Sequence, residues 1–319
     1  MRIVVFGPER RVGALVGENV IDLNGAFARA RSPQEADARV PARLDAFIDL
    51  GAAALDDAQR AIEHAASMGP GGAVVYRTGD VTLHAPWPGR RIACAGGNFA
   101  QHLAGMEAGA NVTLDDVTRR ARERGQWGFW KVPDVVAGPD DAIPFPKHAT
   151  YLDYEGEAAV ILGKRGKDIP AGRIAEYIWG ITLVNDWSIR DPMGAPRPMS
   201  YNQPKNFDMS TSMGPCIVVG ELDAQDVTVE TRVNGVMRQS FNTEEMIWSF
   251  GEILEFLSED FTFIPGDVIS GGTNAGTAQD KSKPGPDGRR PLDLFLKVGD
   301  VIEVSSPAIG TLRNRITQA

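Results

Sequence analysis

The chain is short of the residues that several common protein classes require. It has only two cysteines, Cys94 and Cys216, among 319 residues, which excludes a disulfide framework and a four-thiolate zinc site. No apolar run approaches the roughly 18 residues that a membrane-spanning helix needs. The N-terminal stretch from Met1 to Phe6 has no apolar core of the signal-peptide type. We therefore expect a reduced, cytoplasmic protein that makes no use of a membrane.

The charge balance excludes another class of partners. The 33 Lys and Arg residues are outnumbered by 42 Asp and Glu residues, so the formal net charge is −9. Such a chain presents no overall basic surface, and we expect no binding to nucleic acid. The sequence also lacks a P-loop, a Gly-x-Ser-x-Gly nucleophile elbow and a dinucleotide fingerprint after a strand. These absences argue against nucleotide-dependent and serine-hydrolase chemistry.

What the sequence does contain is the pattern of a mixed, strand-rich fold. Its hydrophobic content of 43% is enough for a sizeable core. Short strands are predicted within residues 1–23, followed by helical periodicity over 42–67 with Gly51 as a break. The stretch from Ala85 to Gly89 resembles a linker because it is rich in proline. We therefore predict a small N-terminal α+β domain at 1–85 and a catalytic domain at 86–319.

Short strands dominate the predicted larger domain. They are expected at 91–95, 154–162, 178–185, 217–219, 227–233, 268–269 and 301–304. Helices are expected at 98–124 and 243–257, the second with Thr243 as its cap. Residues 274–290 are rich in Gly, Pro and charged side chains, which predicts a mobile loop. The fold class is therefore α+β with β-structure dominant.

The most informative segment is Asp153-Tyr154-Glu155-Gly156-Glu157, which leads into an apolar run. Glu155 and Glu157 point to the same side of a strand because alternate side chains share a face. Two carboxylates at the start of a buried strand repel each other and lose hydration, and a divalent cation relieves both penalties. Asp186, at the end of another apolar strand, is a natural third ligand. The alternatives are solvated glutamates at an exposed strand end and a capped turn at Asp186.

A few basic and polar residues are candidates for contacting an anionic substrate. Only 8 of the 33 basic residues are lysines, and Lys131 and Lys205 have aromatic neighbours that indicate partial burial. A partly buried ammonium group can stabilise a carboxylate or an enolate, although a snorkelling surface lysine is the alternative. His102 follows a flexible, glycine-containing segment and is a candidate general base. The glycine-rich stretch 271–276 predicts a loop that binds substrate through backbone and hydroxyl groups.

Taken in chain order, these segments resemble the fumarylacetoacetate hydrolase superfamily. The resemblance extends from about residue 91 to residue 315 and rests on nine short motifs, each weak alone. They are Asp-Tyr-Glu-Gly-Glu (153–157), Asn-Asp-Trp-Ser-Ile-Arg-Asp (185–191), Lys-Asn-Phe-Asp (205–208), Gly-Pro (214–215), Val-Asn-Gly (233–235), Pro-Gly-Asp-Val-Ile (265–269), Gly-Gly-Thr (271–273), Gly-Asp-Val-Ile-Glu (299–303) and Ile-Gly-x-Leu-x-Asn (309–314).

The resemblance implies a mixed β-roll or sandwich of the fumarylacetoacetase C-terminal type, in a homodimer. It implies a Mg²⁺ or Mn²⁺ ion held by Glu155, Glu157 and Asp186. His102 matches the family's catalytic histidine, and Lys205 matches a lysine that contacts the substrate's carbonyl or enolate oxygens. The predicted substrate contacts are Lys131, Arg190, Gly272 and Thr273.

The chain departs from the family's pattern near the histidine. Some members that cleave acylpyruvates carry a glutamate three residues after it, where this chain has Gly105. We predict that Asp293 replaces that glutamate as the partner of His102, with Glu107 as the second candidate. The family's Gly-Thr-Pro also becomes Gly272-Thr273-Asn274. These departures leave the metal ligands intact and concern the substrate and the reaction.

The predicted function is a metal-dependent hydrolase that cleaves a C–C bond of a 1,3-diketo acid, an acylpyruvate or a fumarylacetoacetate-like compound. The metal and Lys205 would stabilise an enolate, and His102 would activate water. The alternative is a decarboxylase, dehydratase or tautomerase of a 2-keto acid that uses the same enolate. A third hypothesis, which Gly105 suggests, is a catalytically idle metal-bearing scaffold that binds a ligand or partner.

Overall fold

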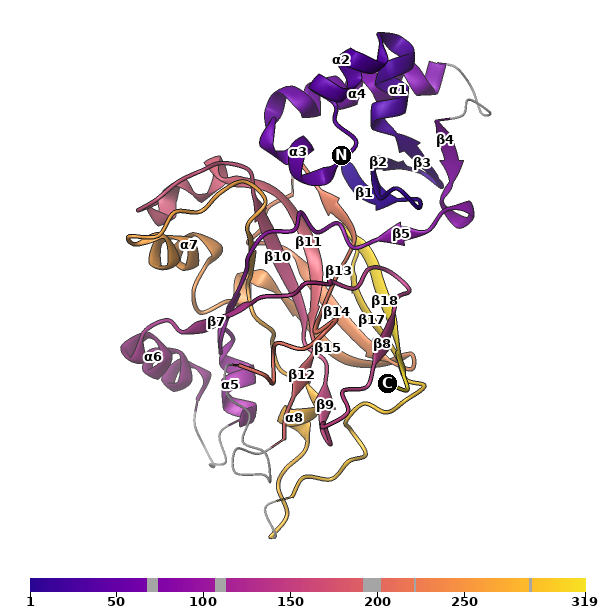
Figure 1. Ribbon diagram of the computed structural model, residues 1–319. Coiled ribbons are helices and arrows are strands. Elements are labelled where there is room, and N and C mark those ends of the chain that lie inside the picture. The colour runs from indigo at the N-terminus through magenta and orange to yellow at the C-terminus, as the bar shows by residue number, and fades with distance from the viewer. Residues whose placement is uncertain (68–73, 107–112, 192–201, 221, 287–288) are drawn as a thin grey trace.

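One long, twisted sheet runs through the molecule (Figure 1). A computed structural model describes residues 1–67, 74–106, 113–191, 202–220, 222–286 and 289–319. In sheet order the strands are β4 (Val75–Arg77), β3 (Asn19–Asp22), β2 (Arg11–Val16), β1 (Arg2–Phe6), β13 (Thr211–Val218), β11 (Ile178–Asp186), β10 (Gly156–Leu162), β16 (Val268–Ser270), β6 (Ile92–Ala95) and β7 (Gly128–Lys131), with β5 (Leu83–His84) beside β1.

A smaller sheet packs against the middle of the long one. Its order is β15 (Val236–Asn242), β14 (Thr228–Val233), β17 (Val301–Ser306), β18 (Gly310–Thr317) and β8 (Ala142–Pro144), and β12 (Ser188–Ile189) pairs separately with β9 (Leu152–Asp153). Val160 and Ile269 from the long sheet share one core cluster with Val229, Val304 and Leu312 from the smaller one. The core between the sheets is therefore built from alternate residues of strands on both sides.

The helices fall into two groups along the chain. Four of them form the N-terminal lobe: α1 (Leu23–Ala30), α2 (Pro33–Arg39), α3 (Leu44–Asp49) and α4 (Ala52–Ser67). The others lie farther along the chain: α5 (Ala100–Met106), α6 (Leu114–Arg124), α7 (Phe250–Ser258) and α8 (Ala278–Lys281), with 3₁₀ turns η1 (Thr78–Asp80), η2 (Ala171–Glu176) and η3 (Thr243–Glu245). None of these described helices is long and apolar enough to cross a membrane.

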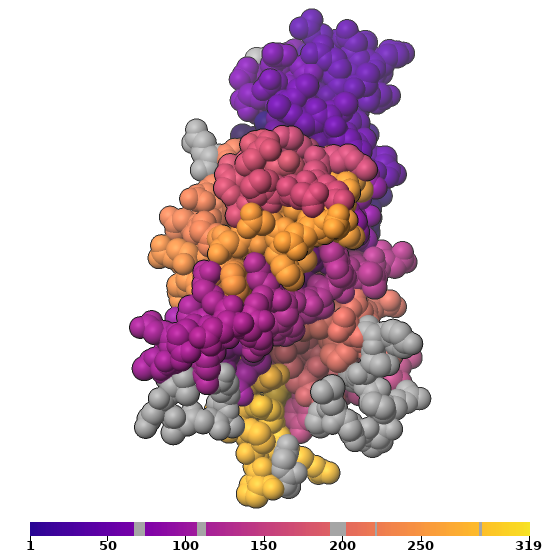
Figure 2. Space-filling model, turned by 90° about the vertical axis from the view of Figure 1, so that its left-hand side faces the viewer, coloured from indigo at the N-terminus to yellow at the C-terminus, as the bar shows by residue number. Residues whose placement is uncertain are grey.

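The N-terminal lobe is joined to the rest of the molecule through the long sheet. Strand β1 pairs antiparallel with β13, with Ile3 opposite Ile217. Gly51 separates α3 from α4 in a left-handed conformation (φ +62°), as the sequence predicts, while α1 and α2 were not anticipated. In Figure 2 this lobe stands at one end of the molecule, in indigo. The domain boundary at residue 85 stays a prediction.

Three predicted elements differ from the structure. The helix expected at 98–124 is α5 and α6; Asn98 precedes α5 and hydrogen-bonds to the backbone of Trp248 and Gly271. The helix expected at 243–257 begins instead at Ser249, whose capping box with Glu252 starts α7. Residues 274–282 were expected to be mobile, but they are largely buried and contain α8.

Candidate functional site

Three carboxylates meet in the interior where two neighbouring strands begin and end. Glu155 and Glu157 stand at the start of β10, and Asp186 ends β11, which runs antiparallel beside it with Gly156 opposite Asn185. The start of one strand therefore lies next to the end of the other. All three side chains are buried, and each offers an oxygen within 4.8 Å of the others' oxygens. The predicted ligand set is thus brought together in one place.

Three basic side chains surround this carboxylate cluster. Lys205 Nζ donates to Glu155, to Asp186 Oδ2 at 2.8 Å and to Ser188 Oγ at 2.6 Å. It also lies 5.1 Å from the centre of the Phe129 ring. The side chain of Lys205 is largely buried, as its sequence context predicts, and its charge is held against two of the three carboxylates.

Lys131 and Arg190 complete the shell of cations. Lys131 is fully buried, and its Nζ donates to Asp186 and to the Ser210 carbonyl oxygen at 2.7 Å. Arg190 donates to Glu155 and, through Nε, to Asp153 Oδ2 at 3.1 Å. Both side chains are thus paired with carboxylates. To contact a substrate, as the sequence predicts, each would have to do so while keeping its ion pair.

The surroundings shift the pKa values of the two glutamates in opposite directions. Burial alone would raise the pKa of Glu155, but Arg190, Lys205 and His102 together hold it well below the usual value. Burial lowers the pKa of Lys205, but the neighbouring carboxylates of Asp186 and Glu155 raise it by more. The net effect is an increase, so Lys205 stays protonated at neutral pH. Burial beside Asp186 and Glu155 raises the pKa of Glu157 to about 8, against a weaker opposing effect of its hydrogen bond from Ser270.

The charge distribution leaves room for one more cation. The four buried acids Asp153, Glu155, Glu157 and Asp186 face three bases, Lys131, Arg190 and Lys205. Among the described residues, Glu157 is the acid of this group with no basic side chain within ion-pair distance. Hard oxygen donors in a buried, net negative cluster suit Mg²⁺ or Mn²⁺. The residues present therefore fit the divalent cation that the sequence predicts.

A histidine–aspartate pair lies beside this cluster. His102, on α5, is buried, and its Nδ1 lies 2.9 Å from Asp280 Oδ2. The same Asp280 oxygen accepts the backbone N–H groups of Gly276 at 3.0 Å and Thr277 at 3.3 Å, at the start of α8. The carboxylate is thus fixed by the helix start, and it fixes the imidazole in turn. His102 is close enough to the cluster for its charge to lower the pKa of Glu155.

The partner predicted for His102 is wrong. Asp293 is exposed, whereas His102 is buried against Asp280. The second candidate, Glu107, lies outside the described residues. Gly105, three residues after His102, lies close to Asp280: a Cβ at Gly105 would lie 3.0 Å from Asp280 Cβ. The space that a longer side chain would need is therefore filled by Asp280.

The glycine-rich loop adjoins the cluster, but its hydroxyl is already engaged. Thr273 Oγ1 donates to the Gly156 carbonyl oxygen at 2.8 Å and accepts from Gln239 Nε2 at 2.8 Å. Gly272 has a positive φ of +86°, and a Cβ there would lie 2.9 Å from the Ala95 carbonyl oxygen. A substrate carboxylate would therefore meet the backbone of this loop more readily than the Thr273 hydroxyl, whose single proton is already donated.

Sequence reasoning missed Asp280, Asp153 and Ser270 as parts of the site. Asp280 had a usable signal, because Thr277 and Asp280 have the spacing of a capping box, which predicts a helix start inside the expected loop. Asp153 stood in the acidic motif but was not assigned; it accepts from Arg190 and from the backbone of Ala278. Ser270 ends a strand whose place beside β10 only the sheet order reveals.

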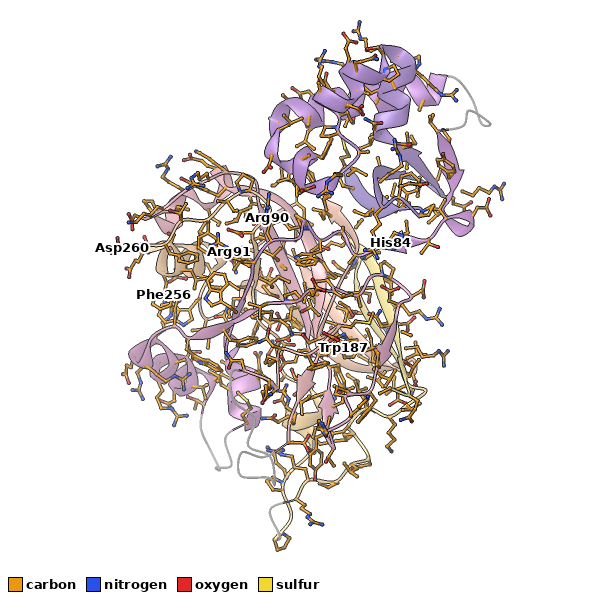
Figure 3. All side chains as sticks on the ribbon, viewed as in Figure 1. His84, Arg90, Arg91, Trp187, Phe256 and Asp260 are labelled. Carbon is orange, nitrogen blue, oxygen red and sulfur yellow. The ribbon has the colours of Figure 1, made fainter. Side chains whose placement is uncertain are left out.

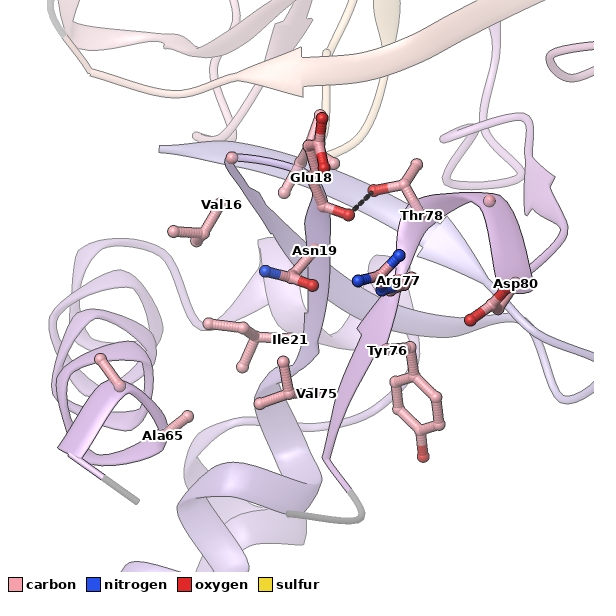
Figure 4. Close-up of a pocket in the computed structure, with 14 residues that line it drawn as sticks. Val16, Glu18, Asn19, Ile21, Ala65, Val75, Tyr76, Arg77, Thr78 and Asp80 are labelled. Atoms are coloured by element: carbon pink, nitrogen blue, oxygen red, sulfur yellow. Dashed lines mark hydrogen bonds between the residues drawn. The ribbon is translucent and has the colours of Figure 1, made fainter. Parts of the chain in front are cut away.

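A large cavity lies elsewhere. It measures 1270 Å³ and is lined by residues of β2, β3, β4, α4 and the η1 turn, among them Val16, Ala65 and Tyr76 (Figure 4). None of its lining residues belongs to the carboxylate cluster or to the His102–Asp280 pair. By contrast, Trp187, which directly follows Asp186, is fully buried in the strand-rich interior (Figure 3). This cavity therefore does not coincide with the candidate site, which is marked by its buried charge.

Comparisons with known proteins show the family to which the chain is similar. The family model for the fumarylacetoacetate (FAA) hydrolase C-terminal domain matches residues 91–317. An oxaloacetate tautomerase of Bacillus subtilis (strain 168) is 34% identical over 250 residues, 77% of this chain and 76% of that protein. A mitochondrial oxaloacetate tautomerase of Homo sapiens is 29% identical over 326 residues, 99% of this chain and 91% of that protein.

A solved structure extends the likeness to the whole chain. The fumarylacetoacetate hydrolase of the psychrophile Exiguobacterium antarcticum is 29% identical, with a TM-score of 0.71 and full coverage of both chains. The strand-rich α+β class expected from the sequence is therefore confirmed. The names of these relatives include both tautomerase and hydrolase activities, so the reaction itself is a separate question.

Proposed function

Because the chain belongs to the fumarylacetoacetate hydrolase family, we propose that it is a divalent-metal-dependent enzyme that interconverts the enol and keto forms of oxaloacetate or a closely similar 2-oxo dicarboxylate. The observation that carries this proposal is the buried Glu155–Glu157–Asp186 cluster beside the His102–Asp280 pair. Such a site combines a place for a cation with a group that can move a proton. These are the two requirements of enolisation next to a carbonyl.

The order of the two candidate reactions follows from the relatives. The sequence led first to hydrolysis and second to tautomerisation or another enolate reaction. The two similar curated relatives described above are both named oxaloacetate tautomerases, and one of them aligns with 99% of this chain. This supports tautomerisation as the first candidate.

The mechanism assigns each group one task. A bound Mg²⁺ or Mn²⁺ would supply Lewis acidity to the oxygens of the 2-oxo acid. Lys205, which is kept protonated by its carboxylate neighbours, would stabilise negative charge on the same oxygens. His102 would carry a proton between the enol oxygen and the carbon next to the carbonyl, so that an O–H bond breaks, a C–H bond forms and the C=C double bond becomes a C=O double bond. Asp280 would hold the imidazole by its Nδ1, leaving Nε2 for the substrate.

Hydrolysis of a 1,3-diketo acid is the second candidate, and the same histidine favours it. A buried carboxylate that orients an imidazole is the arrangement that activates water for attack on a carbonyl. The full-length structural relative named as a fumarylacetoacetate hydrolase supports this reading. Hydrolysis differs from tautomerisation in one respect that can be measured: it consumes water and yields two carboxylic products.

A single assay separates the two candidates. Enol-oxaloacetate is supplied with Mg²⁺, with Mn²⁺ or with EDTA, and the loss of enol absorbance is followed while the products are quantified. We expect loss faster than in buffer, dependent on metal, with oxaloacetate conserved. Acylpyruvates tested in parallel would be expected to persist. Metal-dependent release of two acids from an acylpyruvate, without acceleration on oxaloacetate, would replace the first candidate with the second.

A further inference from the structure

The backbone between two of the predicted metal ligands is held by side chains from distant parts of the chain. Gly156 lies between Glu155 and Glu157, and its N–H donates to Gln239 Oε1 at 3.1 Å. Its carbonyl oxygen accepts from Thr273 Oγ1 at 2.8 Å. Gln239 Nε2 in turn donates to Thr273 Oγ1 at 2.8 Å, which closes a ring of three residues.

The side-chain amide of Gln239 can make all of its hydrogen bonds in only one orientation. The oxygen must face the Gly156 N–H, and the nitrogen must face the carbonyl oxygen of Asn274, to which it donates at 2.8 Å, and Thr273 Oγ1. Gln239 is 1% exposed and Thr273 is 4% exposed, so water has little access to replace these bonds. Gly156 is closely packed, because a Cβ there would lie 2.1 Å from Thr231 Oγ1, so no larger residue fits at this point of the ring.

The ring also reaches toward the histidine. Asn274 Nδ2 donates to Glu245 Oε2 at 3.1 Å, and Gln101, the residue before His102, donates to the same oxygen at 3.0 Å. The carboxylate strand, the glycine-rich loop and the start of α5 are therefore linked by one path of side-chain hydrogen bonds. Gln239 stands where that path meets the metal ligands.

We infer that Gln239 is a positioning residue that sets the spacing of Glu155 and Glu157 for the divalent cation and fixes the glycine-rich loop relative to them. The inference rests on the proposed metal-dependent function, but it concerns metal affinity and so can be tested without turnover. Groups that orient metal ligands typically affect affinity or activity by about 10- to 100-fold. Gln239 would act through Gly156 and touch neither cation nor substrate.

The test is a titration of the full chain with Mn²⁺, followed by electron paramagnetic resonance of the free ion. We expect Gln239→Leu to raise the Kd for Mn²⁺ at least about tenfold. Gln239→Glu keeps an acceptor for Gly156 but loses both donated bonds, and should also bind more weakly. Thr273→Val opens the ring at another corner and should reproduce the effect, while Thr273→Ser retains the hydroxyl and should restore affinity.

Gln225→Leu is the matched control. Gln225 is a half-buried glutamine that bonds the backbone of Thr243 and Phe250, and it does not contact the carboxylates. It should lose thermal stability with an unchanged Kd. Wild-type Mn²⁺ affinity in folded Gln239→Leu would overturn the inference, and if that variant does not fold, wild-type affinity in Thr273→Val would do so. Failure of the wild type to act on oxaloacetate would leave these metal titrations as informative as before.

Discussion

Asp280 Oδ2 lies 2.9 Å from His102 Nδ1, although the two residues are 178 positions apart in the sequence. Both are buried, and the carboxylate is held by the backbone at the start of α8. The pair gives the imidazole a defined orientation, because the nitrogen facing Asp280 carries the proton that a carboxylate accepts.

Removing the charge of Asp280 should impair proton transfer and leave the metal in place. Asp280→Asn is expected to lower kcat by roughly 100-fold, since a positioned acid–base group contributes on that order. Its Kd for Mn²⁺ should stay at the wild-type value, because Asp280 is not among the cluster carboxylates. The control is Asp293→Asn at the exposed site, which should retain full kcat. Equal losses in both variants would contradict the assignment.

A methyl group at Gly105 should disturb the same pair from the other side. A Cβ there would lie 3.0 Å from Asp280 Cβ, closer than side chains normally approach, so Gly105→Ala should displace Asp280 and reduce kcat. At Gly172 a Cβ meets nothing within 4 Å, and Gly172→Ala provides a control with the same chemical change. Steady-state kinetics on both variants, with melting temperatures, would check this. An unaffected kcat at Gly105→Ala would mean that the pair tolerates displacement.

Metal-free protein should lose stability as pH rises, because of Glu157. Its pKa in the folded chain is raised from 4.5 to about 8, so between these values the folded state retains a proton that the unfolded state has released. The contribution of this group therefore falls with increasing pH, by about 1.4 kcal/mol per pH unit, and levels off above pH 8. In EDTA, Glu157→Gln should be more stable than wild type at pH 8, with the difference vanishing near pH 4.5.

A divalent metal should make wild type more stable than Glu157→Gln at pH 8. At pH 8, Mg²⁺ or Mn²⁺ should raise the melting temperature of wild type by binding only the folded state, and should do so far less for Glu157→Gln. Thermal melts of both proteins at two pH values, with EDTA and with metal, make the comparison complete. If metal stabilised both proteins equally at pH 8, Glu157 would not be a ligand.

The two lysines should respond differently to removal. Lys131 is fully buried, so Lys131→Met leaves Asp186 with one cation fewer in the interior and should lower stability by roughly 3 kcal/mol or more. Lys205 bridges Glu155 and Asp186, and its side chain is 15% exposed. Lys205→Met should therefore affect mainly kcat for the enolisation, with a smaller effect on stability than Lys131→Met has. Denaturant unfolding and steady-state kinetics on both variants would show whether the roles divide in this way.

Local pattern was sufficient for part of the site. The alternation of a strand placed Glu155 and Glu157 on one side, and the apolar run after them indicated burial; both are found. Asp186 could be grouped with them because it ends another apolar strand. The break between α3 and α4 at Gly51 likewise followed from a residue that tolerates positive φ. The alternation at Glu155 and Glu157 and the break at Gly51 have causes within a few residues, whereas the approach of Asp186 depends on the pairing of β10 with β11.

The rest depended on contacts that local pattern does not encode. Asp293 and Asp280 are both aspartates in a stretch rich in turn-forming residues, and only the burial of α8 against α5 selects Asp280 as the partner of His102. Gln239 meets Gly156 across 83 positions because β15 belongs to the sheet that packs on β10. The pattern along the chain predicted which carboxylates gather and that a divalent cation would relieve their repulsion. The tertiary structure decided which distant side chains orient them, because those pairings follow from sheet order and packing and not from any repeat along the chain.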